Sequence, residues 1–190
     1  MNSQCEQDLL QRARAFDMQA LAEIYDRYSP GLYNYAMRLL GNECQAEDCV
    51  AETFSRFLKS LRADQGPEAY LQAYLYRIAH NWITDHYRRQ PVFDLDEDLR
   101  AGEEACPEVQ ADRRMQQERV RQALRLLTPD QRQVIVLRFL EGWDNETVAA
   151  AVQKPSGAVR ALQHRALISL RRWLLGEEKE GDYEAEPGDG

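Results

Sequence analysis

The chain has 190 residues, of which 44% are hydrophobic, so it has room for one domain or two small ones with real cores. Glycine and proline are sparse, and long stretches rich in Ala, Leu, Gln, Arg and Glu favour helix. The formal net charge of −8 at first argues against a nucleic-acid partner, and because no apolar run reaches signal-peptide or membrane length, we expect a soluble cytoplasmic protein without membrane insertion.

Two helices are predicted at the start of the chain, at residues 6–16 and 18–40. In the second, apolar residues recur at spacings of three and four, which is the period of one helix face. Pro30 lies inside that pattern, and its missing N–H and fixed φ should kink or divide the helix. Gly41 and Asn42 should end it.

Two more helices are predicted at about 45–62 and 67–90, separated by a loop at 63–67. Pro67 is expected near the first turn of the later helix. That helix interleaves aromatic rings with polar and cationic side chains, which suits unstacked bases and a single-strand backbone, although some of the rings must be core. The residues concerned are Tyr70, Tyr74, Tyr76, Trp82 and Tyr87, and Arg77, His80, Asn81, Arg88 and Arg89.

Residues 92–112 lose the helical periodicity and gain acids, together with Gly102 and Pro107. A structureless segment of this length is unusual inside one compact domain. The sequence therefore predicts an all-α fold of two small helical domains joined by a flexible acidic linker. A helix should restart at 113–127.

The C-terminal part has the layout of a helix-turn-helix module, in which a pair of helices props a last helix against the DNA major groove. Thr128, Pro129 and Gln131 match a capping box with proline at the first helical position. The expected elements are a helix from Pro129 to Glu141, a helix at about 145–152 capped by Asp144, a turn at Gln153-Lys154-Pro155, and a basic helix at about 156–175.

Charge is distributed unevenly along the chain. Residues 93–118 carry nine acids and three bases, and residues 177–190 carry seven acids and one base. Residues 119–176 carry ten bases and four acids, so the C-terminal module is basic. The acidic linker and a tail that we expect to be disordered either only aid solubility or shield the basic surface until a partner arrives.

No group of residues suggests catalysis. His80, His86 and His164 are scattered, and the chain has no phosphate-cradling glycine loop. The four cysteines form no CxxC pair, and Cys44 and Cys49 are five positions apart, which suits no metal site, so free thiols are expected. We expect no enzyme, no cofactor and no metal.

Three segments resemble a known family. Ala46–Phe54 and Tyr74–Arg89 resemble region 2 of the extracytoplasmic-function sigma factors of bacterial RNA polymerase, in the sigma-70 superfamily, and Leu127–Trp173 resembles region 4. The resemblance covers about 18–91 and 119–174, in the family's order and with an acidic linker between. The family motifs in the last segment are Gly157-x-Val159 and His164-Arg165-Ala166.

The resemblance implies that residues 1–91 bind the β′ clamp helices of core RNA polymerase and melt the −10 promoter element. A flipped base captured near the loop 62–67 would stabilise the open strand, because unpairing costs a few kcal/mol that a pocket can return. The candidate polymerase-binding residues are Asp48, Glu52, Arg56 and Lys59. The candidate −10 residues are Arg62, Asn81, Asp85, Arg88 and Arg89.

The resemblance further implies that residues 119–175 read the −35 duplex and touch the polymerase β-flap, with 92–118 as the linker and 176–190 as the tail. The candidate −35 residues are Ser156, Arg160, Gln163, His164 and Arg165, since Arg or Gln at a groove-facing position can read base edges. Many family members are held off by an anti-sigma protein between the two domains, so an inhibitory partner of this kind is expected, and the linker would permit it.

The sequence also departs from the family's usual residues, at Ala51, Tyr74, Trp143, Gln153-Lys154-Pro155, Ala158 and Leu162-Gln163. Gln153 stands where a glycine tolerates positive φ, so it should strain or reshape the turn. Trp143 replaces a small polar residue and is either a core plug or an exposed anchor for a partner. Beside a sigma factor, the departures leave open a sigma-like DNA-binding regulator or adaptor that does not itself initiate transcription.

Overall fold

The structure is a computed structural model that describes residues 3–89 and 107–175, with side chains for residues 5–89 and 115–175. Within these ranges every regular element is helical and no strand occurs, which confirms the expected all-α fold. The predicted tail and the predicted linker up to residue 106 lie outside the described residues.

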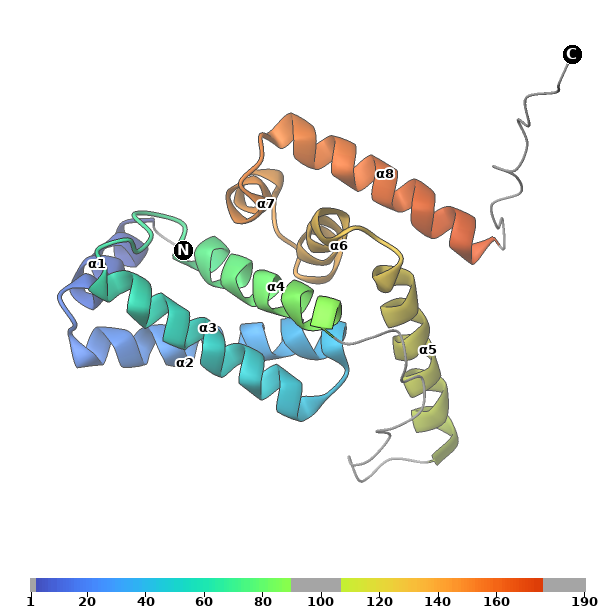
Figure 1. The fold of residues 1–190 in the computed structure, drawn as a ribbon, viewed down its shortest axis with the longest axis horizontal. Coiled ribbons are helices and arrows are strands. Elements are labelled where there is room, and N and C mark those ends of the chain that lie inside the picture. The colour runs from blue at the N-terminus through green and yellow to red at the C-terminus, as the bar shows by residue number, and fades with distance from the viewer. Residues whose placement is uncertain (1–2, 90–106, 176–190) are drawn as a thin grey trace, which may run out of the picture.

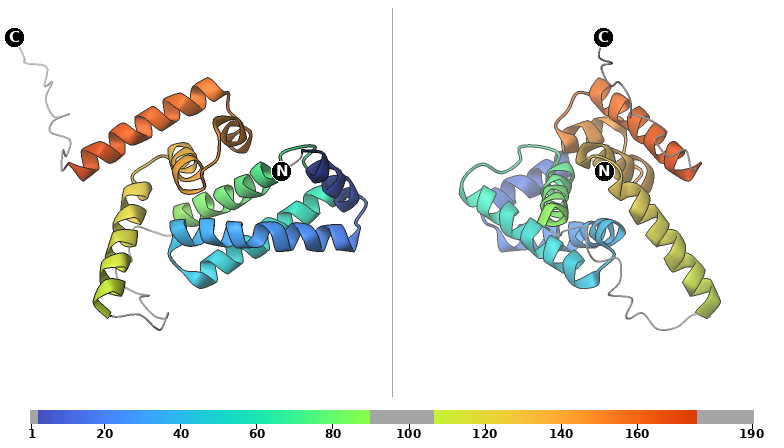
Figure 2. Two further views of the ribbon diagram at one scale, coloured as in Figure 1. Left: turned by 180° about the vertical axis from the view of Figure 1, so that it is seen from behind. Right: turned by 45° about the vertical axis from the view of Figure 1, so that its right-hand side comes forward.

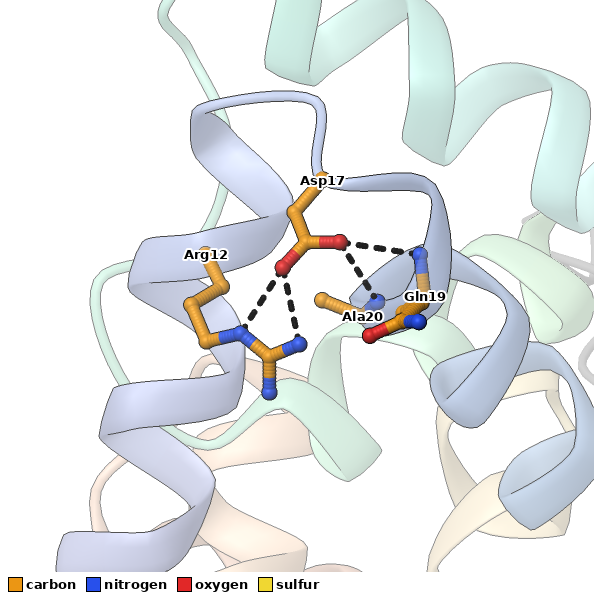
Figure 3. A network of polar contacts seen from close by, with 4 residues as sticks. All are labelled: Arg12, Asp17, Gln19 and Ala20. Atoms are coloured by element: carbon orange, nitrogen blue, oxygen red, sulfur yellow. Dashed lines mark hydrogen bonds and ion pairs between the residues drawn. The ribbon is translucent and has the colours of Figure 1, made fainter.

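The first two helices meet at a capped corner. Helix α1 spans Ser3–Arg14 and α2 spans Met18–Leu40. Asp17 caps α2, because its carboxylate accepts from the Gln19 and Ala20 backbone N–H groups and pairs with Arg12 at 2.7 Å (Figure 3). The hydrogen bond from Arg12 is the main cause that lowers the pKa of Asp17, so the cap stays ionised at neutral pH.

Helix α2 is not divided at Pro30. It runs unbroken because its inner face is buried along its whole length, from Ala20 to Leu40. That packing outweighs the roughly 3 kcal/mol that a proline costs in a helix interior. Gly41 ends the helix as expected, at φ 72°, and Asn42 caps the next one.

Helix α3 spans Glu43–Arg62 and α4 spans Leu71–Arg89, so α4 begins four residues later than Pro67. Tyr70 has a left-handed backbone, with φ 54°, which interrupts any helix before it. The Leu71 N–H donates to Glu6 Oε1 at 2.6 Å, so a side chain from α1 satisfies the first turn of α4. Helices α1–α4 form the N-terminal bundle (Figure 1), and its apolar core is continuous with that of the helices that follow.

Helix α5 spans Pro107–Arg125 and begins six residues earlier than the expected 113. Proline is well suited to a first helical position, because its missing N–H needs no partner there. Helix α6, Pro129–Ile135, has the predicted capping box at Thr128 and continues as a π-helical turn, η1, Val136–Leu140. The predicted helix to Glu141 therefore has two parts.

Helix α7 spans Asn145–Val152 and is capped by Asp144 as predicted, and α8 spans Ser156–Leu174. Helices α5–α8 with η1 form the C-terminal bundle. In Figure 1 and in both views of Figure 2, α6 and α7 lie between α8 and the N-terminal bundle. Helix α7 packs on α4, and α8 packs on α6 and α7, so α8 is an outer layer of the molecule.

Candidate nucleic-acid interface

Helix α8 is a cationic helix with an open outer face. Its 19 residues contain four arginines and no acid, and none of these arginines lies within ion-pair distance of an acid in the described part of the chain. Buried Val159 and Ala166 hold its inner face on the bundle. A helix held from behind, with uncompensated guanidinium groups outward, suits a phosphate-rich partner.

The structure brings the candidate −35 residues together on α8. Ser156, Arg160 and His164 are exposed and one helical turn apart, so they share a face. Gln163 is half-buried beside them, and Arg165 is exposed on the flank, where its Nε donates to the Ala161 carbonyl at 3.4 Å. Four of the five candidates are therefore open to a DNA groove.

The turn before α8 keeps a helix-turn-helix geometry despite its unusual residues. Gln153 itself adopts the left-handed conformation, with φ 53° and ψ 42°, and its N–H donates to the Ala149 carbonyl. A non-glycine residue in this region costs about 1 kcal/mol. Lys154 Nζ lies 3.1 Å from Asp130 Oδ2, which ties the turn to α6. The turn is thus strained, as expected, but its backbone has the left-handed conformation that a glycine would adopt at this position.

The candidate −10 residues are spread along the N-terminal bundle. Asn81, Asp85 and Arg88 follow one another at helical spacing on α4, and an exposed ion pair joins Asp85 Oδ1 to Arg88 Nη1 at 3.8 Å. Arg89 is exposed at the end of the same helix. Arg62 instead ends α3, close to the start of α4, and its guanidinium lies 5.8 Å from the Phe16 ring centroid. Arg62 and Arg89 therefore stand at opposite ends of α4.

The aromatic residues of α4 divide between core and surface. Tyr76 is buried, and Trp82 stacks on His86 with ring centroids 5.1 Å apart. Tyr74 contacts Phe57 and the Arg77 guanidinium. Tyr70 is 58% exposed in the loop before the helix. The expectation that some of these rings are core is confirmed, and Tyr70 is the ring most open to a base.

The candidate polymerase-binding residues form one continuous strip on α3. Asp48, Glu52, Arg56 and Lys59 follow at spacings of four, four and three, on the side of the helix away from its buried residues. Arg56 Nε lies 2.8 Å from Glu52 Oε1, and this hydrogen bond lowers the pKa of Glu52. Asp48 and Lys59 are exposed at the two ends, so the strip offers both signs of charge to a partner.

A contact between the two bundles is the main feature that the sequence did not reveal. Trp143 is only 8% exposed, and its ring centroid lies 4.7 Å from that of Tyr76 on α4. Such a pair contributes about 0.5–1.5 kcal/mol beyond the burial of its area. Trp143 is thus buried between the bundles. Of its two expected roles, a core residue or an exposed anchor, the structure favours the first.

Polar groups surround this ring pair. Arg38 on α2 forms an ion pair with Glu141 and donates to the Leu140 carbonyl at 3.1 Å. The Tyr76 O–H donates to Glu141 Oε2 at 3.5 Å. Burial is the main cause that raises the pKa of Glu141, which means that its charge depends on these partners.

A buried histidine extends the contact along α4. His80 Nε2 lies 3.1 Å from the Pro129 carbonyl, which can only accept, so Nε2 carries the proton. The Tyr35 hydroxyl then donates to Nδ1 at 2.8 Å. Burial, followed by the nearby Arg132, lowers the pKa of His80 to about 4.

A cation–π contact lies near the C-terminal end of α4, at Tyr87. The Arg132 guanidinium lies 4.8 Å from the Tyr87 ring centroid, and that of Arg125 lies 5.8 Å away. Tyr76, His80 and Tyr87 recur along α4 at spacings of four and seven, and this regular stripe is the local signal that could have indicated a second packing face.

Two further expectations concern sites of other kinds. In the part of the chain that the structure describes, no three His, Cys, Asp or Glu side chains gather as metal ligands. Cys5, Cys44 and Cys49 are free thiols, while Cys106 lies outside the described residues. Among residues 3–89 and 107–175, no helix has both the length and the apolar character that crossing a bilayer requires.

Comparison with known families matches both bundles. Residues 24–91 match Sigma-70 region 2, and residues 117–170 match Sigma-70, region 4. The chain is 33% identical to the ECF RNA polymerase sigma factor BldN of Streptomyces coelicolor, over 88% of this chain and 65% of that protein. It is 32% identical to SigX of Bacillus subtilis, with 82% and 84% covered, and 31% identical to SigL of Mycobacterium tuberculosis, with 85% and 93% covered.

Two solved structures share the fold. CnrH, in complex with the cytosolic domain of CnrY, aligns with a TM-score of 0.68 and 24% identity over 90% of this chain and 98% of that one. The sigma factor RpoE, in complex with the anti-sigma factor NepR from Bartonella quintana, aligns with a TM-score of 0.56 and 22% identity over 83% and 98%.

Proposed function

The chain belongs to the extracytoplasmic-function group of RNA polymerase sigma factors, and we propose that it binds core RNA polymerase and directs it to a specific set of promoters. The observation that carries this proposal is the pairing of a region 2 bundle with an outward-facing cationic α8 in one chain. The role involves no catalysis by the chain itself and belongs in the cytoplasm, where polymerase and chromosome are.

In this proposal the two bundles have separate tasks. Residues 1–91 bind the β′ clamp helices through the α3 strip and hold the −10 strand along α4. Residues 119–175 contact the β-flap and read the −35 duplex through α8, while 92–118 connect the halves and 176–190 form a tail. The open α8 face and the mixed charges of the α3 strip support this division.

We further propose that an inhibitory protein of the anti-sigma class controls the chain. RpoE, which shares the fold, was solved with such a partner. A connection of 17 residues, 90–106, between the described bundles gives a partner room to act on both.

The test is run-off transcription with core polymerase and a promoter library. We expect transcripts that depend on the added chain, and a shift of core polymerase on a sizing column. A chain that binds promoter duplex without producing any transcript would instead be a sigma-like adaptor, for which the strained turn at Gln153 gives some support. Failure to bind core polymerase at all would contradict both parts of the proposal.

A further inference from the structure

Helix α1 lies beside the loop that joins α3 to α4, residues 63–70 (Figure 1). Arg14, the last residue of α1, donates through Nη2 to the Pro67 carbonyl at 2.9 Å and to the Gly66 carbonyl at 3.3 Å. Hydrogen bonds from a charged guanidinium are stronger than those between neutral groups. The end of α1 therefore holds the middle of this loop.

A second side chain of α1 holds the far end of the loop. Glu6 Oε1 accepts from the Leu71 N–H at 2.6 Å, at the point where α4 begins. Residues 68–70 lie between the two attachments and are exposed, and no hydrogen bond from another described residue reaches their N–H groups. This segment has no bonds of its own to fix it, so its shape depends on the two ends. The bonds that Glu6 and Arg14 make to the loop are called the loop brace below.

The loop adopts a conformation that its residues do not favour by themselves. Asp64 and Tyr70 both have φ 54°, in the left-handed region that residues with a side chain rarely enter. Gly66 passes so close to the end of α3 that a Cβ there would lie 2.7 Å from Leu61 Cδ2. Pro67 is buried. Strained backbone of this kind persists only where its surroundings hold it, which is what the loop brace does.

The same end of α1 also positions Arg62, a candidate −10 residue. Phe16 follows α1 with φ 56°, and its ring centroid lies 5.8 Å from the Arg62 guanidinium carbon. This distance is that of a cation–π contact. Helix α1 and the residues that follow it thus contact both the loop and the cationic side chain beside it.

We propose that Arg14 is a positioning residue for base selection at the −10 element. Together with Glu6 it presets the loop 63–70 in the conformation that captures a flipped base, and Arg14 itself does not contact the DNA. Capture must return the cost of unpairing, and a loop that is already ordered spends none of its binding free energy on ordering. This inference rests on the proposed function, which assigns the −10 strand to the N-terminal bundle.

Hydrogen exchange in the full-length chain, followed by NMR, tests the loop brace without polymerase. The Leu71 amide, bonded to Glu6, and the Gln65 amide, bonded to the Ser60 carbonyl at 2.9 Å, report on the two sides of the loop. Arg14→Ala should speed exchange at both amides about tenfold, since it removes a charge-assisted attachment.

Arg27→Ala is the matched control for every measurement. It also removes one exposed arginine from a helix of the N-terminal bundle, but Arg27 pairs with Glu23 within α2 and does not contact the loop. Exchange at the two loop amides should be unchanged in this variant. Circular dichroism checks that each variant remains folded.

Base selection is measured with the holoenzyme, the full chain bound to core polymerase. The probe is a library of promoter duplexes with a premelted, randomised −10 strand, and the bound DNA is sequenced. Arg14→Ala should lower the preference for the captured base about tenfold while the −35 preference stays the same. Partial unfolding would lower the amount of bound DNA but not the ratio between bases. Arg14→Lys keeps a charged donor and should recover most of the preference.

Salt dependence separates positioning from a direct phosphate contact. Loss of one phosphate contact lowers the slope of log affinity against log salt by about 0.7 for a single strand. Because Arg14 acts through the loop, Arg14→Ala should leave this slope unchanged.

Unchanged exchange at Leu71 and Gln65 in Arg14→Ala overturns the loop brace. Faster exchange with an unchanged base preference, or a reduced salt slope, overturns the positioning role. A wild-type holoenzyme that selects no −10 base contradicts the proposed function and removes the positioning role with it, whereas exchange in the isolated chain still reports on the loop brace.

Discussion

The N-terminal bundle is held by long apolar helix faces, whereas in the C-terminal bundle the long outer helix α8 buries little of itself and rests on the short helices α6 and α7. Helices α4 and α8 have the same length, 19 residues, yet seven residues are buried in α4 and two in α8. Polar groups stabilise much of the C-terminal bundle. They are the capping box at Thr128, the helix cap at Asp144, and the Arg132 guanidinium, which donates to three carbonyls.

The two bundles also differ in how much helix surface they leave exposed to a partner. A helix that buries little of itself keeps most of its surface for a partner, and α8 has exposed arginines together with exposed Leu167 and Ile168. We infer that the N-terminal bundle is the stable half and that the C-terminal bundle depends more on its contacts, including those of Trp143 and Glu141 with the N-terminal bundle.

Core truncation should give the largest effect. Phe57 is 1% exposed at the centre of the N-terminal bundle, and Phe57→Ala should lower the free energy of unfolding by about 3–5 kcal/mol. Val159→Ala beneath α8 should cost about 2 kcal/mol. Urea unfolding measures both, with exposed Phe139→Ala as the near-neutral control. A larger loss for Val159→Ala than for Phe57→Ala would contradict the central place of Phe57 in the N-terminal core.

The contact between the halves should weaken in mild acid. Because the folded pKa of His80, about 4, lies below its unfolded value of 6.5, the associated stability is complete above pH 6.5 and is lost as pH falls toward 4. The full loss is roughly 3 kcal/mol, and about 2 kcal/mol is lost by pH 5. The groups facing His80 are Tyr35 from α2 and Arg132 and Asp130 from α6.

Urea unfolding of the whole chain at neutral pH and near pH 5 measures this dependence. His80→Gln keeps a donor and an acceptor but does not titrate, so it should remove that part of the pH slope. An identical slope in His80→Gln would mean that other groups control the acid sensitivity.

Substitutions in α8 should separate the two DNA-facing helices. Arg160→Ala should weaken binding to the −35 duplex about tenfold, within the 1–3 kcal/mol of a base contact, whereas Ser169→Ala on the same helix should have little effect. Arg89→Ala, on α4, should leave binding to an isolated −35 duplex unchanged. Fluorescence anisotropy measures all three, and equal losses for Arg160→Ala and Arg89→Ala would remove the proposed division of tasks.

Removal of residues 177–190 should give the smallest effect. Those residues carry seven acids and one base, opposite in sign to α8, so we expect that the chain without them binds duplex DNA a few-fold more tightly at low salt. The gain should shrink at high salt because screening weakens the attraction between tail and helix. An affinity that is unchanged at low salt would show that the tail does not shield α8.

Local signals predicted most of the helices. The capping box at Thr128, the Asp144 cap and the end of α2 at Gly41 were all predicted from short-range chemistry, and all are present in the structure. The starts of α4 and α5 were misplaced, since Pro67 suggested a helix start that the left-handed Tyr70 prevents, and acidic composition concealed the first turns of α5.

Contacts between residues far apart in sequence could not be predicted from local sequence patterns. Tyr76 and Trp143 are far apart in sequence, with residues 90–106, α5, α6 and η1 between them, and nothing near either residue specifies the other. For the same reason Tyr76 could not be told from Tyr70 as core or surface. The candidate site residues rest on family resemblance, and the structure adds that most of them are open on the faces where the proposal needs them.

Footprinting of a promoter complex tests the central claim most directly. A complex of core polymerase and this chain should protect two segments roughly 25 base pairs apart, and a chain carrying Arg160→Ala and His164→Ala should lose the upstream segment while the downstream one remains. A single protected segment, or loss of both segments together in that variant, would contradict the assignment of separate promoter elements to the two bundles.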